Sequence, residues 1–157
     1  MRLIVSVKDA ALQAALKGYP QRLHARVLRT INRFTVELQA RVKAKLSGEV
    51  LHVRTGTLRR SINRELREEG GTILGIVGTN VSYAAAHEYG FDGEVTVKAH
   101  LRRAAGAKRK AMAATPVREH TRRMVLPERS FLRSALEELA PKFEADVRQA
   151  AVEALRP

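Results

Sequence analysis

The sequence predicts a mixed fold of helices and antiparallel strands, and three observations lead to this prediction. Apolar residues recur at helical spacing over two long stretches, one early in the chain and one at its end. Between them lie shorter runs in which apolar and polar residues alternate, as they do in half-buried strands. With 157 residues, of which 45% are hydrophobic and 29% charged, the chain is long enough for one domain with a real core.

Composition restricts the classes of function. The absence of cysteine excludes a disulfide framework, a thiol nucleophile and Cys-ligated metal sites. No apolar run approaches a membrane span and the N-terminus is charged too early for a secretory signal, so we expect a soluble protein that no signal exports. The formal net charge of +13 fits a highly soluble surface, a polyanionic partner or an acidic protein neighbour.

The first two predicted elements are a short strand and a long helix. Residues 2–8 alternate as an edge strand does, and from Pro20 the apolar spacing predicts one helix that ends at Gly48. The predicted buried stripe of this helix consists of Leu23, Val27, Ile31, Phe34, Leu38, Val42 and Leu46. The opposite, cationic face carries Arg22, Arg26, Arg29, Arg33, Lys43 and Lys45.

The middle of the chain predicts a hairpin, a short helix and a further strand. Gly70-Gly71 separates two extended runs, which is typical of a hairpin turn. A short helix is expected over residues 83–89, with Gly90 as its terminator. We expect the next strand over residues 94–103.

A basic segment occurs twice in the chain. Residues 97–103 read VKAHLRR and residues 117–123 read VREHTRR, which predicts two similar strands around one loop. We therefore expect residues 94–126 to form a projecting hairpin with a mobile basic tip over 104–116. Paired directly, the two copies would form a matched cationic ladder, which requires an anionic partner, solvent or an offset register. The basic residues of this hairpin are Lys98, His100, Arg102, Arg103, Lys108, Arg109, Lys110, Arg118, His120, Arg122 and Arg123.

The last predicted element is a second amphipathic helix with Ser130 as its N-cap. Its predicted buried residues are Phe131, Leu132, Ala135, Leu136, Leu139, Phe143, Val147, Ala151 and Leu155. Pro141 lies inside it, so we expect a kink or a break into two pieces near Leu139. The helix also carries many of the acids, which with the basic first helix favours head-to-tail contact between subunits.

The chain lacks the common catalytic patterns. His87-Glu88 lies on the predicted short helix, but Phe91 stands where a zinc protease needs its second histidine. His100 and His120 face each other across the hairpin if it forms, yet the surrounding Lys and Arg disfavour a metal cation. No phosphate-binding loop or serine nucleophile elbow is present, so we expect no enzyme, cofactor or metal site. The carboxylates considered for acid and base catalysis, all expected on solvated faces, are Glu65, Glu68, Glu69 and Glu88.

Contact with nucleic acid has some support in the sequence. The basic hairpin is suited to touching phosphates, with an affinity that falls as salt rises. No zinc-finger, homeodomain or RNA-recognition signature is present. A stand-alone, non-specific nucleic-acid-binding protein is therefore the alternative function.

Four segments occur in an order that resembles a known family. They are TGTLRRSI at residues 55–62, VGTNVSYA at 77–84, HEYG at 87–90 and PERSFLRSAL at 127–136. The series, which spans roughly residues 53–139, resembles the tail-component family of tailed bacteriophages. That family is similar in role to the lambda minor tail protein Z, in tail completion or head–tail joining.

The resemblance implies an α+β subunit, a single domain over residues 1–157, in which the two long helices pack a small antiparallel sheet. It implies a structural virion protein without catalysis or cofactor, one subunit of a homo-oligomeric ring at the neck or upper tail. Its expected neighbours are connector, tail-terminator or tail-tube proteins, with non-specific contact to phage DNA and none to membranes. It would be found in the virion and, during assembly, in the host cytoplasm.

The resemblance also divides the residues by role. The basic residues of the hairpin are expected to contact neighbours or DNA. The motif residues are expected to keep the fold: Thr55-Gly56 as a turn before a helix, the two tyrosines packing the short helix on the sheet, and Phe131-Leu132 as a staple for the last helix. This fold-keeping set is Thr55, Gly56, Leu58, Tyr83, Glu88, Tyr89, Gly90, Phe131 and Leu132.

Overall fold

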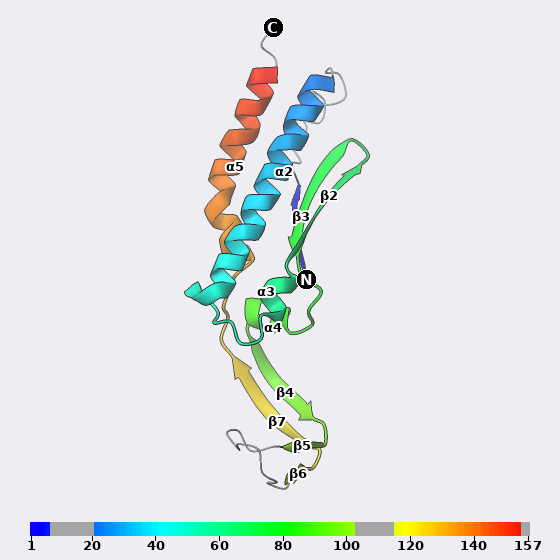
Figure 1. The fold of residues 1–157 in the computed structure, drawn as a ribbon, viewed down its shortest axis with the longest axis vertical. Coiled ribbons are helices and arrows are strands. Elements are labelled where there is room, and N and C mark those ends of the chain that lie inside the picture. The colour runs from blue at the N-terminus through cyan, green and yellow to red at the C-terminus, as the bar shows by residue number, and fades with distance from the viewer. Residues whose placement is uncertain (7–20, 103–114, 155–157) are drawn as a thin grey trace, which may run out of the picture.

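The molecule has two parts, a body of helices and sheet and a narrow ribbon that extends from one end of the body (Figure 1). The computed structural model describes residues 1–6, 21–102 and 115–154, and all structural statements concern these residues. The α+β class predicted from the sequence is confirmed.

The long helix α2 (Gln21–Ala44) is the central element of the body and contacts both the sheet and the last helix. All seven residues of the predicted stripe are buried, which confirms the helical pattern. The last turn widens into the π-helix η1 (Lys45–Glu49), where Gly48 adopts a φ of 132°. Only glycine adopts such a backbone angle without strain, so the helix ends where the sequence predicts.

The sheet has the strand order β1-β3-β2 and is antiparallel throughout. β1 (Arg2–Ser6) is an edge strand as predicted, and β3 (Thr72–Gly78) is central and mostly buried. β2 (Asn63–Glu69) joins β3 through the predicted Gly70-Gly71 turn, in which both glycines have positive φ. α2 crosses β3 closely at Gly75, because a Cβ there would lie 2.4 Å from Thr35 Cγ2.

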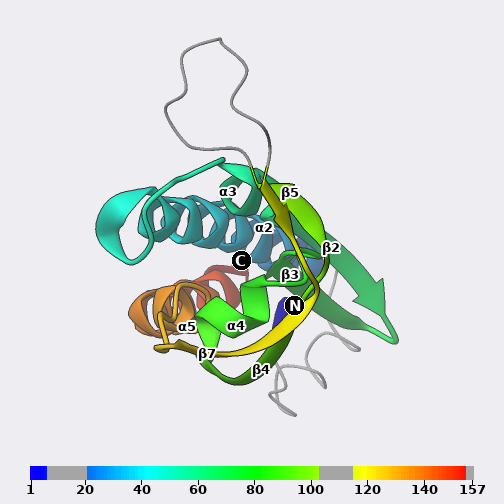
Figure 2. The same cartoon turned by 90° about the horizontal axis from the view of Figure 1, so that it is seen from below.

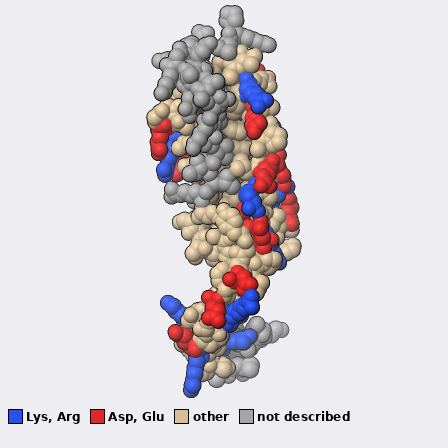
Figure 3. Space-filling model, turned by 180° about the vertical axis from the view of Figure 1, so that it is seen from behind, with Lys and Arg blue, Asp and Glu red and all other residues tan. Residues whose placement is uncertain are grey.

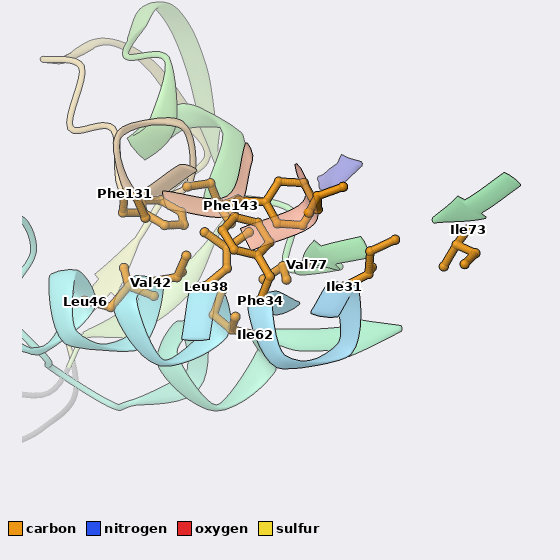
Figure 4. Close-up of a cluster of buried hydrophobic side chains, with 14 of the residues drawn as sticks. Ile31, Phe34, Leu38, Val42, Leu46, Ile62, Ile73, Val77, Phe131 and Phe143 are labelled. Atoms are coloured by element: carbon orange, nitrogen blue, oxygen red, sulfur yellow. The ribbon is translucent and has the colours of Figure 1, made fainter. Parts of the chain in front are cut away.

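The last helix, α5 (Arg133–Ala154), runs antiparallel beside α2 (Figure 1). The Phe34 and Phe143 rings meet between the two helices with centroids 4.2 Å apart, inside the cluster shown in Figure 4. Phe131 and Leu132 are fully buried in the same cluster. α5 continues through Pro141 as one helix, so the break into two pieces expected near Leu139 is wrong.

The ribbon is a long two-stranded ladder with a bend near its far end. β4 (Phe91–Val97) pairs with β7 (His120–Leu126), and β5 (His100–Arg102) pairs with β6 (Thr115–Val117). The single strand expected over 94–103 is therefore two strands, and the first begins earlier than predicted. The predicted mobile tip over 104–116 lies almost wholly outside the described residues.

Two short helices lie between the larger elements. α3 (Thr57–Ser61) precedes the sheet hairpin, and α4 (Ala84–Glu88) falls within the predicted short helix over 83–89. Seen from the ribbon end, α4 lies beside the start of α5 (Figure 2). Among the described helices, none combines the length and low polarity that a membrane crossing requires.

Candidate assembly interface

The ribbon joins the body at a buried carboxylate. Glu88, at the end of α4, is 0% exposed and accepts hydrogen bonds from the backbone N–H groups of Phe131, Leu132 and Arg133, at 2.8, 2.9 and 2.8 Å. The Ser130 hydroxyl donates a further bond to the same carboxylate at 2.8 Å. These amides at the start of α5 have no partner within the helix, so Glu88 satisfies them and complements the helix dipole.

The structure corrects two sequence predictions about this junction. Glu88 was expected on a solvated face, which is wrong, because the start of α5 covers it on folding. Ser130 accepts one amide hydrogen bond, from Ser134 at 3.2 Å, but most of the capping comes from Glu88, more than forty residues earlier in the chain. A contact between such distant residues has no local sequence pattern.

The two strands of the ribbon leave the body side by side at this junction. The Arg129 N–H donates a hydrogen bond to the His87 carbonyl oxygen at 2.8 Å. These two residues directly precede Ser130 and Glu88 in the sequence. Gly90 has a φ of 77°, and a Cβ on it would lie 3.0 Å from the Leu126 carbonyl oxygen. The HEYG and PERSFLRSAL segments are thus one structural unit, from which the paired strands β4 and β7 extend.

The ribbon has one apolar face and one polar face. The strand register places Phe91 opposite Leu126, Gly93 opposite Met124 and Val95 opposite Arg122 on the first face. The apolar members of this face are half-buried, and the Phe91 ring lies over Gly93, where a Cβ would be 3.0 Å from its Cζ. On the second face Arg123 donates two hydrogen bonds to Asp92, at 2.9 and 2.8 Å, which lowers the pKa of Asp92.

The repeated basic segments meet where the ribbon bends. Val97 pairs with His120 and His100 pairs with Val117, so the two copies are related by an approximate twofold. Nδ1 of His100 lies 2.9 Å from the Lys98 carbonyl oxygen, and Nδ1 of His120 lies 3.0 Å from the Arg118 carbonyl oxygen. The matched cationic ladder does not form, because this register sets each histidine opposite a valine rather than another basic residue.

The basic residues of the ribbon lie in different settings. Arg123 is held by Asp92, whereas no described residue forms an ion pair with the other described members of the set. All of those are exposed: Lys98, His100, Arg102, Arg118, His120 and Arg122. The remaining members fall outside the described residues: Arg103, Lys108, Arg109 and Lys110.

In the body, by contrast, three cations of α2, Arg26, Arg33 and Arg41, are paired with acids of α5. Arg26 binds Glu153 at 2.7 Å and Arg33 binds Asp146 at 2.8 Å. Glu138 accepts hydrogen bonds from Arg41 at 2.7 Å and Lys45 at 2.5 Å, and these bonds lower its pKa to about 2. These basic and acidic residues are therefore paired inside the chain, and head-to-tail contact between subunits stays a prediction.

The first family-like motif lines a groove of about 550 Å³ beside α3 and α4. Thr55, Gly56 and Leu58 line it, and Gly56 precedes α3 with a φ of 73°. Tyr83 lies on its wall with 44% of its surface exposed. Tyr83 and the 59% exposed Tyr89 do not pack α4 onto the sheet as expected, because Ala84 and Glu88 occupy the buried face of α4.

Sequence reasoning missed the cations of this groove. Arg54 and Arg59 from the segment 52–59 and Arg129 from the segment before α5 line the same groove. Arg59 belongs to the TGTLRRSI motif, but nothing in the sequence signals that Arg129 lies near it. Among the described residues, no three His, Cys, Asp or Glu side chains come together as metal ligands.

The matched family agrees with this arrangement. Residues 9–90 match the model of the family described as "Bacteriophage HK97-gp10, putative tail-component". The chain belongs to this family. The match to the HK97-gp10 family covers about half of the chain, includes α2, β2, β3 and the TGTLRRSI motif of the groove, and ends where the ribbon begins. The tail-component resemblance is thus confirmed, although the matched range begins and ends earlier than the expected 53–139.

Membership in this family makes the protein a bacteriophage tail component and hence part of the virion. No curated protein and no solved structure matches the chain.

Proposed function

We propose that this tail component acts in tail completion or head–tail joining, without catalysis, as one subunit of a homo-oligomeric ring at the neck or upper tail. It is made in the host cytoplasm and meets connector, tail-terminator or tail-tube proteins there. The observation that carries this proposal is the ribbon of β4 to β7, a projecting element with an apolar face, whose described residues belong to no core cluster.

The ribbon needs a neighbour for physical reasons. An isolated two-stranded hairpin is at best marginally stable in water. The apolar face of this ribbon contains Phe91, Val95, Met124 and Leu126, none of which belongs to the core cluster of the body. A second protein surface laid on this face would bury these side chains, at roughly 25 cal/mol for each Å² of apolar area covered.

The charge of the ribbon indicates what that neighbour presents. Residues 91–126 hold nine Lys and Arg against three Asp and Glu, so this segment carries +6 of the net +13. Figure 3 shows blue side chains around the far end of the ribbon. Complementary charge favours an acidic neighbour in the assembly, or the phage DNA that passes along the tail axis.

Ring formation is supported by the shape of the subunit. A ribbon that reaches from one copy to the body of the next makes a heterologous contact, in which different surfaces meet. Such contacts close into rings when the rotation between copies divides a full turn. A projecting arm on a self-contained body fits this type of contact better than a twofold dimer.

The test is the mass of the assembly with and without the ribbon. Residues 94–123 would be replaced by a two-residue Asn-Gly turn, which leaves the Glu88 junction intact. We expect nuclease-treated wild-type protein to form rings, by light scattering and negative-stain imaging at low and moderate salt, and the shortened protein to be a folded monomer.

Two results would contradict the proposal. Rings formed equally well by the shortened protein would show that the ribbon is not the contact. A wild-type monomer, also in the presence of purified connector and tail-tube proteins, that binds random-sequence DNA with a steep salt dependence would favour the nucleic-acid-binding alternative.

A further inference from the structure

The groove beside α3 and α4 is a second candidate surface, whose lining residues do not include those of the apolar face of the ribbon. Its volume of about 550 Å³ lies within the range of ligand-binding clefts. It is formed by the turn after α2, by the segment 52–59 and by one side of α4. Leu46 and Leu51 belong to the core cluster and Leu58 packs against it, so the core anchors part of the groove.

The groove combines an apolar lining with apolar side chains that remain open to solvent. Leu46 and Leu51 are buried at its base. Val53 and Tyr83 line it with 50% and 44% of their surfaces exposed. Exposed apolar side chains that gather in a groove are typical of a surface that another molecule covers.

The charged residues of the groove are all basic. Arg54, Arg59 and Arg129 line it, no acidic residue does, and none of the three forms an ion pair with any described residue. The cations between α2 and α5 are instead bound by acids within a few ångströms. The groove is thus a place where the body leaves several guanidinium groups uncompensated.

We propose that this groove binds an acidic segment of another protein, one that carries an apolar side chain among its carboxylates. The apolar side chain would enter the groove between Val53 and Tyr83, and the carboxylates would meet the arginines at its rim. Arginine is suited to this because its planar group binds a carboxylate through two hydrogen bonds. This inference goes beyond the proposed function and does not depend on ring formation.

The charge distribution favours a different protein over a second copy of this chain. Three acids of α5 already bind cations of α2, and Glu88 is enclosed at the ribbon junction. A second copy also brings its own net charge of +13, which opposes its approach to a cationic groove. A nucleic acid would compensate the arginines but would leave the apolar walls to be covered by sugars and bases.

The experiment uses the full chain and a displayed library of random short peptides as the probe. We expect the selected peptides to be rich in Asp and Glu and to contain Leu, Ile or Phe. A synthetic copy of one selected peptide is then titrated by fluorescence polarisation. We expect Arg59→Glu and Val53→Ser each to weaken its binding about tenfold or more, because one removes a charge partner and the other an apolar contact.

Arg148→Glu is the matched control, since Arg148 is 82% exposed on α5, far from the groove. It makes the same charge change and should leave peptide affinity within about twofold of wild type. Val53, Arg59 and Arg148 are all exposed, so thermal melting should show the same fold in each variant. Arg54→Glu provides a second charge reversal in the groove.

Several outcomes would overturn the proposal. They are the absence of enriched acidic peptides, binding that the groove variants leave unchanged, and duplex DNA that competes fully with the peptide at matched salt. Self-association of the wild type that Arg59→Glu alone abolishes would identify a second copy as the occupant. Ring formation without peptide binding would reject the groove and leave the proposed function standing.

Discussion

The body and the ribbon of this tail component differ in how far their apolar side chains are covered and in how many of their charges are paired. In the body, apolar side chains are enclosed between α2, α5 and β3, and the cations of α2 are bound by acids of α5. In the ribbon, one apolar face is only half-covered and the described basic residues other than Arg123 have no acidic partner. The body therefore buries its apolar side chains within the chain, whereas we propose that the ribbon is completed by contact with another molecule.

The largest effect on the body should come from Glu88→Ala. The substitution leaves two buried amides, of Phe131 and Leu132, and the partly buried amide of Arg133 without an acceptor, and each unsatisfied buried group costs about 1–3 kcal/mol. We expect the free energy of unfolding to fall by about 3–5 kcal/mol in urea denaturation. Glu119→Ala is the control, because Glu119 is exposed on the ribbon and should change the free energy by less than about 0.5 kcal/mol. Equal stability of both variants would mean that Glu88 does not hold the two parts together.

Gly90→Ala should have the next largest effect, at the point where the ribbon leaves the body. The new methyl group would meet backbone atoms at 3.0 and 3.1 Å and would hold alanine at a φ of 77°. We expect a loss of about 2–3 kcal/mol in the free energy of unfolding. Gly71→Ala has a similar φ of 79° but nothing within 4 Å, so it should lose only about 1 kcal/mol. If Gly71→Ala lost as much stability as Gly90→Ala, the cost would come from the positive φ alone and not from the close backbone contacts at Gly90.

Acid should weaken the pairing between α2 and α5. Hydrogen bonds from Arg41 and Lys45 lower the pKa of Glu138 from 4.5 to about 2. Because the pKa is lower in the folded state, the stabilisation is fully present above about pH 4.5 and is lost as the pH falls towards 2. We expect Glu138→Gln to be less stable than wild type at pH 7 and to approach wild type near pH 2, in melting temperatures measured across this range. A difference that stays constant with pH would contradict the pairing.

Met124→Glu should have the smallest effect on folding and a large effect on assembly. Met124 lies on the apolar face of the ribbon, outside the core cluster of the body. We expect the urea unfolding of the body to change by less than about 0.5 kcal/mol, while light scattering shows loss of the ring. Thr121→Glu places the same charge on the opposite face and should retain the ring. Loss of rings in both variants would assign the effect to charge rather than to the apolar face.

Elements with a strong local period could be predicted from the sequence. The stripe from Leu23 to Leu46, the Gly70-Gly71 turn and the α+β class are all confirmed, because spacing along the chain determines which side chains share a face. α5 runs through Pro141 without the break into two pieces that was one of the two predicted outcomes. Its buried residues on either side, Ala135 and Phe143, pack in the core and stabilise the helix across the missing hydrogen bond.

The candidate sites were only partly predictable. The basic ribbon follows from the repeated segments, but their register is set by the pairing of whole strands, which places histidine opposite valine. The groove could not be predicted, because Arg59 and Arg129 are seventy residues apart in the chain and meet only after folding. The role of Glu88 could not be predicted either, because its hydrogen-bond partners come after the whole ribbon in the sequence.

The sequence by itself determined the helices, the strands, the charge and the family resemblance, all of which depend on the order of neighbouring residues. Only the tertiary structure decided which charges cancel and which remain. The acids of α5 neutralise α2 because the core brings the two helices together in antiparallel order, so that Arg26 meets Glu153 and Arg33 meets Asp146. The same packing leaves the groove arginines without acids, because ion pairing depends on distance in space and not on separation along the chain.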